Sequence, residues 1–481
     1  MIKPKSSGQN IIFLWLKVLF VFHFTNKVPA QPRILHLSDF LSEVIKHHPM
    51  SLRADLRQEM AISNYLKSKG TLDPTLGANV EQKYFSDKNY YSLLGGELKI
   101  PTILGLDLKT GYSLNRGVFL NPENKVPDNG LIYGGISLPL GQGLLIDDRR
   151  ALIKDAKIGL ESGNLEKLEI KNDLLFNATQ QYWEWFRAYA IFKILEDSEK
   201  IAVKRIEAVK NYVSNGDRPA IDTVEAGIQV QNIRLALMGA SLDLKKNQNS
   251  LLSYIWNEGG ILNQAMTDVA PLEMESELKK MLTDYSPSVA MLDIKSQPYL
   301  LQLRNKLLQQ EIDIRLKRDK LKPKVNLQYT PITEALGNKI ITDYNINNYK
   351  WGVEFKMPLY LRKERGEFQL SNLKLKETEL LLSQKTVEIE TKIENYIIDW
   401  RNTSEQIDIY SETVQQYRQL LDAEKKLFDT GESSLFLINT REQAYIQANI
   451  KLVELLVKNR ISYFTIWYLA GQMQNTLNIG E

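Results

Sequence analysis

The sequence predicts a mainly α-helical protein with a smaller β part, in which two long αα-hairpins each follow a set of β-strands. Landmarks in residues 49–216 recur in the same order in residues 298–431. Each copy has a short helix-like segment and then alternating apolar and polar residues, which are typical of strands. A proline-free run of 67 or 66 residues follows and reaches a glycine, Gly216 or Gly431. A repeat of this length indicates one object built from two similar halves.

The first 30 residues have the pattern of a secretory signal peptide. Lys3 and Lys5 precede an apolar run over residues 11–24, and residues 28–30 include small side chains suited to cleavage. A single N-terminal membrane anchor is the alternative, but an anchor needs about 20 uncharged apolar residues, and Lys17 interrupts the run. Without this segment the chain has 57 basic and 58 acidic side chains, a net charge of −1. This balance does not suggest a nucleic-acid partner.

The first structural repeat is expected at residues 31–256. Its short helix begins at Pro49, because a proline in the first helical turn loses no hydrogen bond. Strands are expected over residues 75–140. From Pro74 to Pro139 is 65 residues, against 35 from Pro323 to Pro358 in the second copy. Residues 85–130 therefore hold an insert that forms either further strands or an extracellular loop. The strand prediction rests on alternating apolar positions, which begin with Leu76, Ala78 and Val80.

The long run of the first repeat predicts a coiled-coil helix that turns back at its tip. At 1.5 Å per residue an unbroken arm would be about 100 Å long. Gly216 ends the arm, and a second helical period starts a few residues later. An aromatic ligand-binding stripe is the alternative, but steps of three and four residues favour helix packing. The outgoing seam has Leu175, Ala178, Tyr182, Trp185, Tyr189 and Phe192, and the return arm has Ile221, Val224, Ile228, Leu235, Met238 and Leu242.

The second structural repeat is expected at residues 298–481, after a connector or equatorial region at residues 257–297. Its strands are expected over residues 324–358, and its hairpin tip at Gly431. The outgoing and returning arms again follow a helical period. The outgoing seam has Ile393, Tyr396, Trp400, Thr403, Ile407, Tyr410, Val414, Tyr417 and Leu421, and the return has Ile446, Ile450, Val453, Val457, Phe464 and Trp467.

The residue types argue against an enzyme. The chain has no cysteine, and its four histidines lie in the first tenth of the sequence, so thiolate and histidine chemistry are not expected. His47 and His48 precede a helix start and are interpreted as helix-end residues, with metal binding as the alternative. The glycines at Gly141 and Gly143 lack the remaining residues of a nucleotide-binding loop. No catalytic, cofactor-binding or metal-binding residue is predicted.

The predicted strands raise the question of a membrane. Four to six strands in one chain are too few for a membrane barrel, which needs at least eight, yet only a closed barrel lets strands cross a bilayer. Three chains of four strands would supply twelve. The alternative is a soluble β-subdomain carried on a helical stalk.

The ordered landmarks resemble the TolC family of outer-membrane efflux proteins. In the first half these are His48-Pro49, Pro74, Pro139-Leu140-Gly141, the helix start at residues 146–151 and Gly216 with residues 220–226. The second half has Pro358-Leu359, Arg365 and Gly431 with residues 432–442. The resemblance implies a homotrimer with a twelve-stranded β-barrel in the outer membrane and a twelve-helix α-barrel in the periplasm. It also implies a periplasmic adaptor (membrane fusion protein) and an inner-membrane transporter of the RND, ABC or MFS type as partners.

The resemblance places adaptor contacts and a gate at the two tips. The implied adaptor-contact residues are Gly216, Asp217, Pro219, Gly431, Glu432 and Ser433, and the gate candidates are Arg218, Asp222, Glu225, Phe428, Leu437, Thr440 and Arg441. Phe428 and Ser433 stand where the best-known member has the tyrosine and arginine partners of Asp222. Leu437 and Thr440 stand at its entrance aspartates. We therefore hypothesise that other carboxylate–arginine pairs hold the tips closed. Solvated helix-end charges are the alternative.

These features favour an outer-membrane exit duct of a tripartite efflux or type I secretion system, which conducts cargo passively. The alternative is a periplasmic adaptor or structural coiled coil without a pore. An adaptor typically has one α-hairpin, whereas this chain has two in tandem, each after alternating strands. The cargo cannot be deduced from the sequence, because the transporter selects it.

Overall fold

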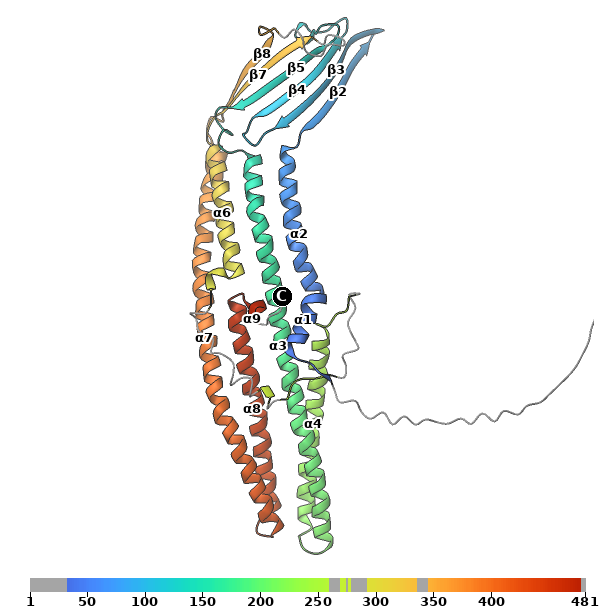
Figure 1. Cartoon of the computed structure of the whole chain (residues 1–481), viewed down its shortest axis with the longest axis vertical. Coiled ribbons are helices and arrows are strands. Elements are labelled where there is room, and N and C mark those ends of the chain that lie inside the picture. The colour runs from blue at the N-terminus through green and yellow to red at the C-terminus, as the bar shows by residue number, and fades with distance from the viewer. Residues whose placement is uncertain (1–32, 259–268, 274–275, 278–291, 335–344, 477–481) are drawn as a thin grey trace, which may run out of the picture.

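The computed structural model describes residues 33–258, 269–273, 276–277, 292–334 and 345–476, so the predicted signal peptide lies outside the described residues. The molecule is elongated, with an antiparallel sheet at one end and helices running away from it (Figure 1). Two long αα-hairpins and a smaller β part confirm the predicted fold class.

The elements follow the predicted order in both halves. The helices are α1 Leu37–His47, α2 Pro49–Lys69, α3 Asp148–Ser214, α4 Ile221–Leu252, α6 Pro298–Asp319, α7 Arg362–Asp429, α8 Leu435–Leu469 and α9 Met473–Thr476. The strands are β1 Arg33–Ile34, β2 Thr75–Phe85, β3 Lys88–Pro101, β4 Asp107–Arg116, β5 Leu131–Pro139, β6 Val269–Ala270, β7 Lys324–Glu334 and β8 Tyr349–Lys356. Short 3₁₀ turns are η1 Gly70–Leu72, η2 Pro122–Asn124 and η5 Ile294–Ser296.

Side-chain caps explain where the helices begin. The Asp147 carboxylate accepts a hydrogen bond from the Arg150 backbone N–H at 2.8 Å and so caps α3. The Gln297 side chain does the same for α6 through Leu300 N–H, at 2.8 Å. His48 caps α2, where its Nδ1 accepts from Met50 N–H at 3.1 Å. Its ring stacks on Tyr254, and burial lowers the pKa of His48.

Each long helix is accompanied by two shorter ones. α3, of 67 residues, has α2 beside its sheet-proximal part and α4 beside its distal part (Figure 1). α7, of 68 residues, has α6 and α8 in the same places. The return arms are thus continued toward the sheet by the short helix of the same repeat. Four helices lie side by side near the sheet and four lie side by side near the tips.

The main sheet has six antiparallel strands in the order β2-β3-β4-β5-β7-β8. The insert at residues 85–130 therefore contributes strands, β3 and β4, and the two repeats join where β5 pairs with β7. Six strands lie within the four to six expected for one chain, whereas the twelve-stranded barrel that the resemblance implies has four per chain. The two additional strands come from the insert, because its residues form β3 and β4 and hydrogen-bond between β2 and β5.

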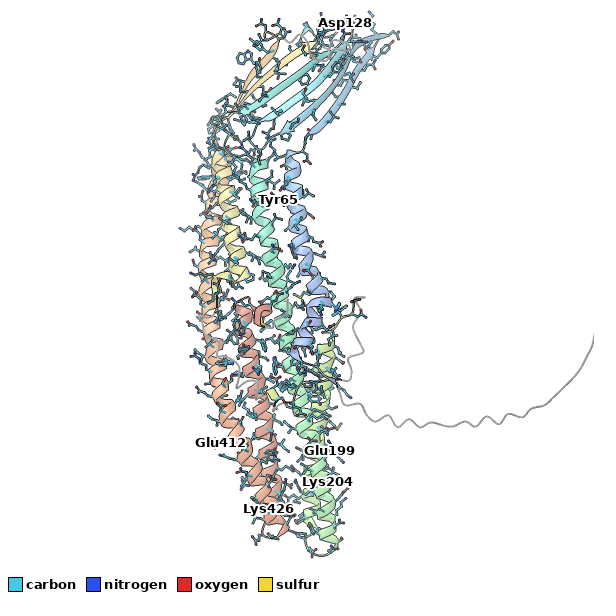
Figure 2. All side chains as sticks on the ribbon, in the orientation of Figure 1. Tyr65, Asp128, Glu199, Lys204, Glu412 and Lys426 are labelled. Atoms are coloured by element: carbon cyan, nitrogen blue, oxygen red, sulfur yellow. The ribbon has the colours of Figure 1, made fainter. Side chains whose placement is uncertain are left out.

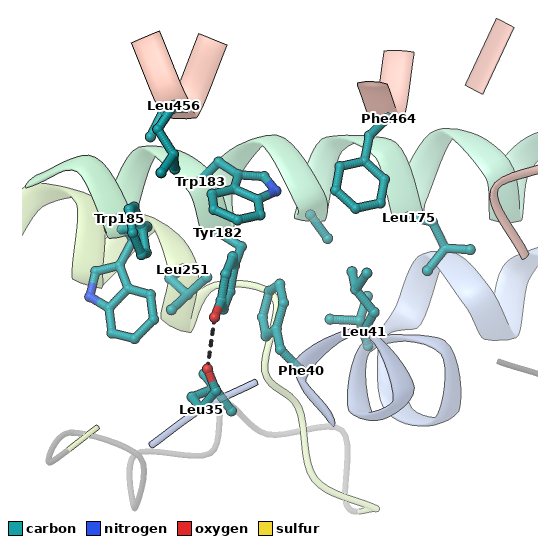
Figure 3. Packing of buried hydrophobic residues seen from close by; sticks show 14 of the residues in the cluster. Leu35, Phe40, Leu41, Leu175, Tyr182, Trp183, Trp185, Leu251, Leu456 and Phe464 are labelled. Atoms are coloured by element: carbon teal, nitrogen blue, oxygen red, sulfur yellow. Dashed lines mark hydrogen bonds between the residues drawn. The ribbon is translucent and has the colours of Figure 1, made fainter. Parts of the chain in front are cut away.

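The main core lies halfway along the helices, where α1, α3, α4 and α8 meet (Figure 3). Tyr182, a predicted seam residue, is buried and donates a hydrogen bond to the Leu35 carbonyl at 2.8 Å. Its ring stacks on Phe40. The two-stranded β1–β6 pair lies beside this core and ties the chain's start to the connector. The aromatic stripe is therefore packing rather than a ligand site.

The outer surfaces of the helices carry charged side chains. Glu199 and Lys204 lie on the first hairpin, and Glu412 and Lys426 lie on the second (Figure 2). Within the described ranges, no helix combines the length and the apolar content required to cross a membrane.

Candidate functional site

The six-stranded sheet has one apolar face and one polar face. Residues paired across neighbouring strands lie on the same face, and their register sorts the side chains. The apolar face includes Leu76, Val80, Leu94, Leu98, Leu108, Ile132, Ile136, Leu327, Tyr329, Trp351, Val353 and Phe355. The polar face includes Asn79, Glu81, Glu97, Lys99, Asp107, Lys109, Ser137, Asn326, Gln328, Lys350, Glu354 and Lys356.

The apolar face is open to solvent in the single chain. Leu76 is 82% exposed, Val80 70%, Trp351 64% and Phe355 67%. These four residues belong to β2 and β8, the two edge strands, along which every residue is exposed. Both edges consequently present unpaired backbone groups beside large apolar side chains, an arrangement that soluble proteins avoid.

Ion pairs fix the sheet to the start of α3. The guanidinium of Arg149 donates to the Asp107 carboxylate on β4 at 2.7 Å. The same guanidinium reaches Asp147 at 3.3 Å. Burial alone would raise the pKa of Asp147, but hydrogen bonds from the Arg150 backbone and guanidinium outweigh it and lower that pKa. The junction between sheet and helix is therefore held by charges on consecutive residues.

The two predicted tips have the same backbone geometry. Gly216 and Gly431 both have φ of +81°. At the first tip Gly216 N–H donates to the Val213 carbonyl and Asp217 N–H to the Tyr212 carbonyl, which is the Schellman pattern of helix ends. Glycine suits this left-handed conformation because it has no Cβ. Gly431 and Glu432 repeat the pattern on α7 through the carbonyls of Phe428 and Leu427.

Arg218 joins the two tips. Its guanidinium donates to the Phe428 carbonyl at 2.9 Å and to the Ser433 carbonyl at 3.2 Å. It also lies over the Phe428 ring, 4.1 Å from the centroid. The partners of this arginine are thus helix-end carbonyls and an aromatic ring, where the sequence hypothesis expected a carboxylate. A cation at the negative end of the α7 dipole is stabilising.

A buried carboxylate organises the second tip. Glu424 is 8% exposed and accepts a hydrogen bond from the Ser433 hydroxyl. The Nε of Arg441 lies 3.8 Å from the other Glu424 oxygen. Among the gate candidates, the contact of Arg441 with Glu424 is the carboxylate–arginine pair found in the described part of the chain. Ser433, an adaptor-contact candidate, is only 9% exposed and faces inward.

A second network ties three helices together above the tips. Arg205 on α3 forms two hydrogen bonds with Glu442 on α8, at 2.8 and 2.5 Å. Arg205 also donates to Asn439 Oδ1 at 3.1 Å, and the Asn439 amide donates to Glu225 on α4 at 3.2 Å. Arg205 and Glu442 are largely buried, with side-chain exposures of 12% and 4%. The network therefore connects the first hairpin to the second.

The other candidates lie at the surface of the tips. Asp217, Pro219 and Glu432 are exposed in the turns beside the two glycines. Asp222 is half-buried, and its carboxylate forms no ion pair within the described part of the chain. Leu437 is 38% exposed. Thr440 hydrogen-bonds its own helix at the Phe436 carbonyl, at 2.8 Å.

Arg205, Glu424, Asn439 and Glu442 were not predicted from the sequence. Arg205 and Glu442 are 237 positions apart, so no local pattern relates them. Arg205 and Glu424 lie on the outgoing arms α3 and α7, and Asn439 and Glu442 lie on the return arm α8. The available signal was a polar side chain among the apolar positions of these arms, which an analysis of apolar spacing alone does not consider. Within the described residues no group of three or more His, Cys, Asp or Glu could hold a metal ion.

The fold is that of known outer-membrane channels. No family model and no curated protein is similar to the chain in sequence. The Campylobacter jejuni CmeC outer membrane channel matches with a TM-score of 0.63 and 14% identity, over 91% of this chain and 86% of that one. The outer membrane protein VceC of Vibrio cholerae matches with a TM-score of 0.65 and 14% identity, over 91% and 96%.

A third match gives the same result. The Neisseria gonorrhoeae MtrE outer membrane channel in its open state has a TM-score of 0.62 and 12% identity, over 91% of this chain and 89% of that one. The chain therefore has the TolC-like fold of outer-membrane channels, and the resemblance deduced from the sequence is confirmed at the level of the fold.

Proposed function

We propose that three copies of this chain form a passive channel through the outer membrane, with the helices extending into the periplasm. The observation that carries the proposal is the six-stranded sheet with one apolar face, one polar face and two unpaired edges. In a bilayer every backbone group must be paired, and only a closed barrel achieves this with strands. Apolar residues then face lipid and polar residues face the lumen.

The helical part supports assembly from several copies. α4 and α7 lie at opposite edges of the helical layer near the tips (Figure 1), and both expose apolar stripes to solvent. Neighbouring copies could bury one stripe against the other, which is favourable by about 25 cal/mol per Å². Four helices lie side by side at each level, so three copies would give a tube of twelve. The stripes are Ile221, Val224, Ile228, Leu235, Met238 and Leu242 on α4, and Ile398, Ile409, Leu420 and Leu427 on α7.

The tips are the proposed contact with the rest of an export system. Gly216, Asp217, Pro219, Gly431 and Glu432 are exposed at the end opposite the sheet, where a periplasmic adaptor could dock. The adaptor would connect the channel to an inner-membrane transporter of the RND, ABC or MFS type, which supplies the energy. The channel contributes no catalytic chemistry, and it serves either efflux or type I secretion.

Fractionation and conductance measurements test this function. The full-length chain should fractionate with outer membranes, run as a trimer in mild detergent and produce single-channel currents in planar bilayers. A chain that stays in the soluble periplasmic fraction and gives no current would overturn the channel, and would favour an adaptor or structural coiled coil instead.

A further inference from the structure

We propose that the β3–β4 hairpin is part of the barrel wall, so that three copies close a barrel of eighteen strands, with β2 of one copy paired to β8 of the next. Each chain supplies six strands. The inference rests on the proposed trimeric channel. It goes further by assigning the seam between copies and the width of the exit.

The hairpin is continuous with the sheet on both sides. β3 pairs with β2 from Lys99 to Lys88, and β4 pairs with β5 from Asp107 to Ser113. The apolar face continues through the hairpin, because Leu94 lies between Val80 on β2 and Leu114 on β4. Farther along the hairpin, Leu108 of β4 lies between Ile100 on β3 and Ile136 on β5. A hairpin folded into the lumen or over the rim would not share this lipid-facing surface.

Side chains lock the hairpin to its neighbours. Tyr133 on β5 lies over Gly111 of β4, where a Cβ would come within 2.5 Å of the phenol ring. Its hydroxyl reaches across β4 to the Glu97 carboxylate on β3, at 3.1 Å. The Asp107–Arg149 pair then fixes the base of β4 to α3. Three strands and the first long helix therefore hold the hairpin in the wall.

The free edges are complementary to each other. β2 runs away from the helices and β8 runs toward them, so their pairing would be antiparallel like the rest of the sheet (Figure 1). If the helix-proximal ends align, Leu76 lies opposite Phe355 on the apolar face. In the same register Glu81 lies opposite Lys350 on the polar face. Apolar and opposite-charge cross-strand pairs are each favourable, and no side chain changes face.

The width of the exit follows from the strand number. Barrel diameter grows roughly linearly with the number of strands, so eighteen strands give a barrel about 1.5 times as wide as twelve. Barrels of 16–18 strands enclose an aqueous channel. The membrane part would then not limit the size of the cargo, and the helical tips would be the narrowest part.

Engineered cysteines test the seam, because the chain has no cysteine of its own. Asn79→Cys with Gly352→Cys places two thiols opposite each other in the proposed register, and a Cβ at Gly352 meets no other atom within 4 Å. Opposed strand residues have Cα separations within disulfide range. Oxidation of the purified trimer should give a covalent trimer on a denaturing gel. The control pair Asn79→Cys with Val353→Cys puts the thiols on opposite faces and should stay monomeric.

Direct imaging of the trimer in lipid nanodiscs tests the count. Eighteen strands around the wall support the proposal, whereas twelve strands with residues 86–116 outside the wall overturn it. A cross-linked ladder that stops at dimers, or no cross-link in protein that conducts ions, also overturns it. Protein that neither enters membranes nor conducts would instead contradict the proposed function itself.

Discussion

α4 and α8 occupy equivalent places in the two repeats but have very different surroundings. Counted from the tip glycines, which are 215 positions apart, Met238 corresponds to Val453 and Leu242 to Val457. Met238 is 71% exposed and Val453 0%, and Leu242 is 54% exposed and Val457 3%. α8 packs between α7 and α3, whereas α4 packs mainly on α3 at the edge of the layer.

The difference shows that one apolar pattern can have two uses. In α8 it completes the core of its own chain. In α4 a second set of apolar residues, among them Ala226, Val230 and Ile233, already covers α3, so the outward stripe remains available to a neighbouring copy. A repeat in sequence therefore does not imply equal burial.

The largest expected difference is in the free energy of unfolding when an aspartate replaces the corresponding apolar residue of α8 or of α4. Val457→Asp buries an unpaired carboxylate in the core and should destabilise the chain by more than about 4 kcal/mol. Circular dichroism melting of the purified variant measures the effect. The matched Leu242→Asp should melt as the wild type does when monomeric, yet yield less trimer in detergent. Equal damage to both melting curves would contradict the comparison.

The second largest difference is expected in the stability lost when an ion pair of α8 or of α4 is removed. Arg205→Ala leaves Glu442 of α8 buried without its partner, and breaking such a pair costs about 3–5 kcal/mol. The matched control is Arg234→Ala, which removes the exposed pair between α4 and Glu199 and should cost about 0–1 kcal/mol. Urea unfolding of both variants, under conditions where unfolding is reversible, measures the two costs. A smaller cost for Arg205→Ala than for its control would refute the assignment.

The close packing of α8 on α3 also has an unfavourable component. Burial raises the pKa of Asp173 on α3, and the hydrogen bond from Tyr468 of α8 only partly offsets this. A raised folded pKa means that the folded chain binds the proton more tightly. Stability is therefore greatest below the ordinary aspartate pKa and falls as pH rises through the folded value. Asp173→Asn should raise the melting temperature at pH 7 more than at pH 4. An equal rise at both pH values would contradict this.

The gate candidates on the two helices should have the smallest energetic effects. Asp222 of α4 and Arg441 of α8 contribute exposed or half-buried charges near the tips, each worth about 0–1 kcal/mol. We propose that several weak contacts of such charges hold a closed state, those of Asp222 being with a neighbouring copy. Replacing either residue with Ala should then raise single-channel conductance in a planar bilayer. Unchanged conductance in both variants would discard the gate hypothesis and leave these charges as solvated helix-end residues.

The sequence was most informative where local rules decide the structure. Glycine at both tips, proline at Pro49 and Pro298, and the three-and-four spacing of the seams predicted the helices and their turns. The strands of the insert were ambiguous, because paired glycines such as Gly95-Gly96 interrupt the alternation. The partners of Arg218 could not be predicted, because any residue supplies a backbone carbonyl and no residue type marks one.

The contact of Arg218 with the second tip requires the two hairpins to reach the same distance from the sheet. Seven residues added to α3 alone would move the first tip by about 10 Å, which would carry the guanidinium away from the Phe428 carbonyl, now 2.9 Å distant. A change in reach therefore requires matched insertions in both halves of the chain and in both arms of each hairpin. The distance from the sheet to the tips is thus set twice in the sequence, once by each repeat.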